Sequence, residues 1–184
     1  MTYQFSKEVD DDRSFEDNKI SKEYNVFDGN KSIGQFFYSS KECFFTYDNT
    51  RIRLDIRKPF FRLPQVSMKD EKSGEAIGKY KLTNALISRD CLIIHRDIYE
   101  FRRLPPNVKH SILKKHTWGH FTFGLSNEVE QIIYSFKIDY PPISLGNIAP
   151  KRRFDGLIDC SSSNKLLILA GLYLVERALE NNND

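Results

Sequence analysis

The C-terminal part of the chain contains one run of residues that constrains the fold more than any other feature. Residues 166–175 read Leu-Leu-Ile-Leu-Ala-Gly-Leu-Tyr-Leu-Val, and no charged residue interrupts them. An α-helix built from this run is apolar on every face, so it must be buried on all sides. The preceding chain consists of short strand-like runs, which indicates that a strongly curved sheet or a β-barrel surrounds the helix. Residues 161–164, Ser-Ser-Ser-Asn, are suited to cap its N-terminus.

The remainder of the chain has the pattern of an antiparallel sheet. A length of 184 residues is ordinary for one domain with its own core, and many of the 14 Phe and 9 Tyr lie in runs of strand length. Turn-forming pairs such as Asp28-Gly29 and Ser126-Asn127 separate these runs. We therefore predict a mainly β fold, an antiparallel β-barrel of about 9–12 strands that encloses a C-terminal hydrophobic α-helix.

Two segments lie outside this regular pattern. Residues 1–22 are polar and acidic, and we expect a polar N-terminal arm or an edge strand there, followed by a single barrel domain at residues 23–184. The acidic run at residues 10–12 is typical of a solvated arm, with a tail that docks onto a partner as the alternative. Residues 107–116 follow two prolines and carry an apolar face, which predicts one short helix.

Charge and cysteine usage narrow the class of protein. The net charge of +3 is mild, so we do not expect a nucleic-acid binder. The N-terminus lacks the apolar segment of a signal peptide, and residues 166–175 are about half as long as a membrane-spanning helix requires. Cys43, Cys91 and Cys160 have no CxxC spacing and are typical of free thiols in a reducing compartment. We expect a soluble, cytoplasmic protein without a transmembrane segment.

Three short stretches occur in an order that is found in a known superfamily. They are Asp-Gly-Asn-Lys-Ser-Ile-Gly at 28–34, Ser-Gly-Glu-Ala-Ile-Gly at 73–78, and Asp-Gly-Leu-Ile-Asp at 155–159 before the apolar helix. This order resembles the tubby C-terminal-like superfamily, which includes the phospholipid-scramblase-like and LURP-one-related proteins. The resemblance implies a twelve-stranded barrel around a C-terminal hydrophobic helix. It implies no catalytic residues, and no motif here matches the phosphoinositide-binding residues of the tubby branch.

The most suggestive polar feature is the alternating strand at residues 51–57. Its apolar side chains point to one face, while Arg51, Arg53 and Arg57 point to the other, about 7 Å apart for each two-residue step. Such a row of guanidinium groups can bind phosphate or carboxylate. Because Asp55 lies inside the row and neutralises part of its charge, a solvated outer strand face is the alternative.

Further basic residues extend this candidate anion-binding set. The complete set is Arg51, Arg53, Arg57, Lys58, Lys151, Arg152 and Arg153. If the barrel brings residues 151–153 beside the strand at 51–57, the two clusters make one anion-binding patch. Otherwise each cluster only solubilises its own loop. A third basic cluster at residues 114–116, near Trp118, has a composition that suits single-stranded nucleic acid, which the mild overall charge disfavours.

The sequence contains no specific catalytic or metal-binding motif. His116 and His120 have the i, i+4 spacing that binds zinc on a helix, but their neighbours alternate as in a strand, which separates them by about 13 Å. Cys91 and His95 have the same spacing in another strand-like run, and there is no Gly-x-Ser-x-Gly elbow. We therefore expect no catalytic residues, no cofactor and no metal.

These observations favour a non-enzymatic binding module of tubby or LURP-one-like type. A barrel filled by its own helix has no free lumen, so a ligand must bind the outer surface or the rim. We expect contact with anionic lipid headgroups or with a protein partner through the outer basic face. A protein-interaction factor, such as an inhibitor or an immunity-like protein, is the alternative, and an enzyme with a rim active site is the second alternative.

Overall fold

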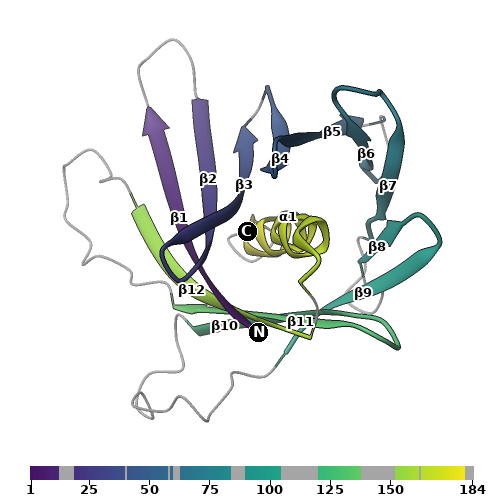
Figure 1. Ribbon diagram of the computed structural model, residues 1–184. Coiled ribbons are helices and arrows are strands. Elements are labelled where there is room, and N and C mark those ends of the chain that lie inside the picture. The colour runs from purple at the N-terminus through teal and green to yellow at the C-terminus, as the bar shows by residue number, and fades with distance from the viewer. Residues whose placement is uncertain are drawn as a thin grey trace.

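Twelve antiparallel strands close into a barrel around one α-helix in the computed structural model of the chain (Figure 1). The structure describes residues 1–12, 19–39, 41–57, 59, 63–83, 90–104, 120–137, 152–161 and 163–180. The strands are β1 (Thr2–Asp12), β2 (Lys19–Asp28), β3 (Lys31–Ser39), β4 (Cys43–Tyr47), β5 (Thr50–Arg57), β6 (Gln65–Asp70), β7 (Ala76–Lys81), β8 (Cys91–Ile94), β9 (Asp97–Arg103), β10 (His120–Ser126), β11 (Gln131–Lys137) and β12 (Arg152–Cys160). The helix α1 spans Lys165–Glu180. The predicted fold class, a helix enclosed by an antiparallel barrel, is confirmed.

The strands follow one another around the barrel in chain order. Each strand pairs with the next, and β1 pairs with β12 to close the barrel. Tight turns allow this order. Asp48 and Asn49, between β4 and β5, have φ angles of 44° and 63°, and two positive φ angles are the backbone signature of a two-residue type I′ hairpin. Gly29, in the predicted Asp-Gly turn between β2 and β3, has a φ angle of 58°, which favours glycine.

The N-terminal residues do not form the polar arm that we expected. Residues 2–12 form β1, which pairs with β2 on one side and with β12 on the other, so it is not an edge strand either. Tyr3 and Phe5 point into the barrel and are buried, two residues apart as a strand requires. The next inward position holds Lys7, which is 6% exposed. This buried lysine interrupts the apolar alternation, which is why the sequence resembles an arm.

The helix α1 forms the centre of the core. Figure 1 shows it inside the ring of strands. Four leucines that cover different sides of it are all 0% exposed: Leu167, Leu169, Leu172 and Leu174. The sequence prediction that this helix is buried on every face is therefore confirmed. Asn164 accepts a hydrogen bond of 3.1 Å from the backbone N–H of Leu167, which makes it the helix N-cap.

Two tyrosines of the barrel wall hold the helix through its backbone. The hydroxyl of Tyr80 donates a hydrogen bond of 2.9 Å to the carbonyl oxygen of Ala170, and the hydroxyl of Tyr134 donates one of 2.8 Å to that of Ile168. Burial raises the pKa of both phenols well above its usual range, so both keep the proton that they donate. Each contact satisfies a buried polar group and fixes the position of the helix.

The helix continues beyond the apolar run and carries a charged residue into the barrel. Glu176 is only 2% exposed. Its carboxylate lies 2.5 Å from Nζ of Lys7 and 2.6 Å from Nζ of Lys22, and it also accepts a hydrogen bond from the hydroxyl of Tyr24. Burial by itself raises the pKa of Glu176, but the two ammonium groups outweigh it and hold the pKa below its usual range. This ion cluster ties β1 and β2 to the helix.

Three further sequence predictions concern the cysteines, the short helix and the lack of a membrane-spanning helix. The three cysteines form no disulfide, with Cys43 and Cys160 buried and Cys91 partly buried. The short helix predicted at residues 107–116 lies outside the described residues. The helix that the structure describes is not long and apolar enough to cross a membrane.

Candidate anion-binding site

Strand β5 presents its arginines to the outside of the barrel, as the alternation predicted. Ile52 and Leu54 are 0% and 4% exposed and face the core, whereas Arg51, Arg53 and Arg57 are exposed. The strand ends at Arg57, two residues before Pro59, which cannot donate a backbone hydrogen bond to a sheet.

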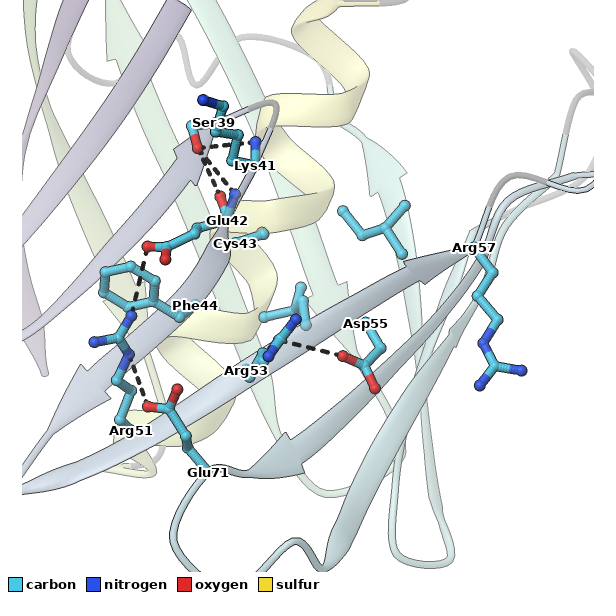
Figure 2. Close-up of a pocket in the computed structure, with 12 residues that line it drawn as sticks. Ser39, Lys41, Glu42, Cys43, Phe44, Arg51, Arg53, Asp55, Arg57 and Glu71 are labelled. Atoms are coloured by element: carbon cyan, nitrogen blue, oxygen red, sulfur yellow. Dashed lines mark hydrogen bonds and ion pairs between the residues drawn. The ribbon is translucent and has the colours of Figure 1, made fainter. Parts of the chain in front are cut away.

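The guanidinium of Arg51 is engaged by its neighbours. Its Nε lies 3.0 Å from a carboxylate oxygen of Glu71, and its Nη2 lies 3.6 Å from one of Glu42 (Figure 2). The guanidinium carbon also stacks 3.8 Å from the ring centroid of Phe44. Glu42 precedes β4 and Glu71 follows β6, so Arg51 links the ends of three strands. Much of its charge is already neutralised.

Arg53 is neutralised in the same way. Its Nε lies 3.4 Å from Asp55, and Nζ of Lys69 on β6 lies 2.8 Å from the other oxygen of that carboxylate. The hydrogen bond from Lys69 is the main cause that lowers the pKa of Asp55; burial opposes it, and the charges of Lys69, Arg53 and Arg57 add to the lowering. Asp55 therefore remains ionised, and it offsets the charge of the row as the alternative interpretation proposed.

A first groove of about 450 Å³ runs along the outside of β4 and β5 (Figure 2). We call it the mixed-charge groove. Its charged lining residues are Lys41, Arg51, Arg53, Arg57, Glu42, Asp55 and Glu71. Four cationic and three anionic side chains leave a net charge of only +1. By itself, this groove is poorly suited to concentrate an anion.

A second groove of about 730 Å³ lies on the outer face of β5–β8. We call it the basic groove. Its charged lining residues are Arg57, Lys69, Lys79, Lys81 and Asp55, and its apolar lining includes Leu63, Pro64 and Ile93. Four cationic side chains and one carboxylate leave a net charge of +3.

Three cations of the basic groove are available for a ligand. Arg57, Lys79 and Lys81 are exposed, and within the described part of the chain none of them forms an ion pair. Lys79 lies opposite Ser67 on β6 and Ile93 on β8, while Lys81 lies opposite Cys91. No carboxylate occupies these opposing positions. Consequently no directly opposing residue neutralises Lys79 or Lys81, and Asp55 is the one carboxylate among the described residues that line this groove.

Arg57 belongs to both grooves, as does Asp55. Figure 2 shows Arg57 at the far end of β5 from Arg51, with no ion pair drawn to it. The two grooves therefore form one continuous outer surface that runs from β4 to β8, with Arg57 at the junction.

Of the remaining residues of the predicted anion-binding set, the described part of the chain includes only Arg152 and Arg153. Lys58 and Lys151 lie outside the described residues, as does the cluster at 114–116. Arg152 and Arg153 begin β12, and four strands, β1–β4, separate β12 from β5 around the barrel. At about 4.8 Å per strand step, the two backbones are far apart, on different sides of the barrel (Figure 1). Of the two alternatives left open by the sequence, the strand order therefore does not favour a single patch made by residues 152–153 and the strand at 51–57.

Sequence reasoning missed Lys69, Lys79 and Lys81. A signal was present in residues 79–81, Lys-Tyr-Lys, where the buried tyrosine and the two exposed lysines have the period of a strand. The lysines become significant only because β7 lies two strands from β5, next to β6.

The structure places Cys91 and His95, the pair that was considered for catalysis, in different elements. Strand β8 ends at Ile94, and His95 occupies the following turn with a φ angle of 52°, so it does not continue the strand of Cys91. In the described ranges, no three His, Cys, Asp or Glu side chains are grouped to hold a metal ion. The side chain of His120 is not among those described.

Comparison with known proteins identifies no relative. No protein-family model, no curated protein and no solved structure matches the chain. The fold and the site together define a class, a helix-filled antiparallel barrel with a basic groove on its outer surface.

Proposed function

We propose that this protein is a non-enzymatic binding module that holds an anionic group in the basic groove. The observation that carries the proposal is the unpaired charge of Arg57, Lys79 and Lys81 on the outer face of the barrel. A carboxylate or phosphate group placed there would meet a planar guanidinium that binds two oxygens and two mobile ammonium groups.

The basic groove lies on the outside of the barrel, where a ligand has to bind because the helix fills the interior. The helix occupies the interior, and residues such as Leu167 and Val175 on it are 0% exposed. A ligand is therefore confined to the outside. Because the groove is open to solvent, its attraction for anions should weaken as salt rises, with a screening length of about 10 Å at 0.1 M.

The resemblance to the tubby C-terminal-like superfamily also supports a binding role. A barrel closed around a C-terminal helix is the architecture that the resemblance implies. Lipid headgroups are one source of the phosphate that the groove would bind, and acidic protein segments are a source of carboxylate. Because fold does not imply function, the charge of the groove is the stronger argument.

Inorganic triphosphate is a suitable first probe, and isothermal titration calorimetry at low and high salt measures its affinity. The triple variant Arg57→Gln, Lys79→Gln, Lys81→Gln should bind about tenfold or more weakly than the wild type, equivalent to at least about 1.4 kcal/mol. The matched control replaces Lys31, Arg96 and Arg102 with Gln, which removes the same charge from exposed positions outside both grooves. The control should bind as the wild type does.

Two results would overturn the proposal. One is absence of triphosphate binding by the wild type at low salt. The other is equal loss of binding in the two triple variants, since this would show that net charge alone, and not the basic groove, attracts the anion.

A further inference from the structure

We infer that the ligand of this surface is an extended acidic peptide segment of a partner protein, which lies across both grooves. The inference rests on the proposed function and specifies the class of its ligand. Three observations carry it: the length of the continuous surface, the arrangement of its charges, and the position of its apolar residues.

The surface is longer than a single anionic group needs. The mixed-charge groove and the basic groove share Arg57 and Asp55, and together they span β4 to β8. Four strand steps of about 4.8 Å correspond to about 19 Å. An extended chain advances about 3.3 Å per residue, so about six residues of a peptide are the minimum that would cross this distance, and the offset of about 20 Å between Arg51 and Arg57 along β5 lengthens the path. One phosphate or one lipid headgroup would fill only part of it.

The charges are arranged in two different parts. The basic groove carries a net charge of +3, whereas the mixed-charge groove places the exposed carboxylates of Glu42 and Glu71 beside Arg51. A membrane surface that is uniformly anionic would meet these carboxylates unfavourably. A peptide can place acidic residues over the basic groove and a lysine or arginine over Glu42 and Glu71, so its charge sequence can match both parts.

The apolar residues point to the same kind of ligand. Leu63, Pro64 and Ile93 are partly buried and line the basic groove, where they can pack against one apolar side chain of a peptide. Contact with a membrane instead favours protruding apolar residues. The large apolar side chains that protrude from the described part of the barrel are Met1, Ile98 and Val129, and they line neither groove.

The test compares three fluorescent peptides and two kinds of vesicle on the full chain. The first peptide, Asp-Glu-Leu-Asp-Glu-Ser-Lys, has the predicted pattern of an acidic part and a basic end. The second replaces its Lys with Glu, and the third has the composition of the first in scrambled order. Vesicles of phosphatidylcholine, with and without phosphatidylserine, test the membrane alternative. Fluorescence anisotropy measures peptide binding, and flotation measures vesicle binding.

The first peptide should bind the wild type, with an affinity that falls as salt rises and exceeds that of the scrambled peptide. The variant Arg57→Gln, Lys79→Gln, Lys81→Gln should lose about tenfold or more of this affinity, and the control at Lys31, Arg96 and Arg102 should not. The variant Glu42→Gln, Glu71→Gln removes the carboxylates that select the basic end. It should therefore lose the preference for the first peptide over the second.

The outcomes separate this inference from the proposed function. Binding of triphosphate together with phosphatidylserine vesicles, but of none of the peptides, would overturn the peptide inference and retain an anion-binding module that contacts membranes. Equal binding of the ordered and scrambled peptides would also overturn it, because no charge order would then be read. Absence of binding to triphosphate and to every peptide would overturn both.

Discussion

The hydroxyl oxygen of Tyr134 lies 2.0 Å from the point that a β-carbon on Gly171 would occupy. Tyr134 projects from β11 into the barrel, and its hydroxyl donates to the carbonyl oxygen of Ile168, one turn before Gly171. The missing side chain at Gly171 gives the phenol access to the helix backbone. Glycine is therefore required here for close approach, and the contact sets the depth of the helix in the barrel.

Gly171→Ala should destabilise the protein by about 1–3 kcal/mol, because the added methyl group overpacks the site. Helix propensity alone predicts the opposite, a gain of about 1 kcal/mol. Urea unfolding measures the difference. Adding Tyr134→Phe should recover part of the loss, because it removes the nearest clashing atom. A more stable Gly171→Ala protein would show that the phenol does not pack against Gly171.

Leu172→Ala should lower the free energy of unfolding by about 2–5 kcal/mol, because the side chain is 0% exposed inside the barrel. Leu166→Ala is the matched control on the same helix, since Leu166 is only partly buried, and its cost should be clearly smaller. Thermal or urea unfolding measures both. Removal of the chain from residue 166 onward should abolish the cooperative transition, and a soluble truncated protein that still melts cooperatively would contradict the central role of the helix.

Glu176→Gln should cost about 3–5 kcal/mol, since it removes the buried carboxylate that Lys7 and Lys22 contact at 2.5 and 2.6 Å. The control Glu71→Gln removes an exposed partner of Arg51, and pairs of that kind contribute about 0–1 kcal/mol. Chemical unfolding of both variants at neutral pH provides the comparison. Similar costs for the two would mean that the ion cluster around Glu176 does not hold the helix end.

The same carboxylate should make stability depend on acid pH. The pKa of Glu176 is lowered in the folded protein, so the unfolded chain binds more protons between that pKa and the unfolded value of about 4.3. Its contribution is complete above about pH 4.3 and is lost as pH falls through the folded pKa. Unfolding free energies measured across this acid range should fall less steeply in Glu176→Gln. Parallel curves for variant and wild type would assign the acid sensitivity to other groups, such as Asp55 and Asp70, whose pKa values are also lowered.

Arg51→Gln with Arg53→Gln should affect triphosphate binding less than the variant at Arg57, Lys79 and Lys81, by roughly twofold against tenfold. Both arginines are already paired with carboxylates, and the double variant should change stability by no more than about 1 kcal/mol. Calorimetric titration beside an unfolding curve checks both expectations. A larger loss of binding in the double variant would move the centre of the site to the mixed-charge groove.

The features that could be predicted from the sequence depend on local periodicity. A run of ten apolar residues needs burial on every side whatever surrounds it, and Asn164 caps the helix through a contact three residues away. Side chains at residues 51–57 alternate between the two faces because of the geometry of a strand. The outward direction of Arg51, Arg53 and Arg57 was therefore correctly predicted. These outcomes require no knowledge of which strand lies beside which.

The features that only the tertiary structure decided involve charges that lie far apart in the chain. Lys7 meets Glu176 across 169 positions, and this contact accounts for a buried lysine within a strand of the barrel wall that was expected to be a polar arm. The order of the strands places Lys79 and Lys81 near Arg57, and it places Arg152 far from that site. A charged side chain looks the same in sequence whether it is solvated or buried against a partner. Barrel closure and strand register decide between these states, because they determine which distant charges meet and which remain unpaired.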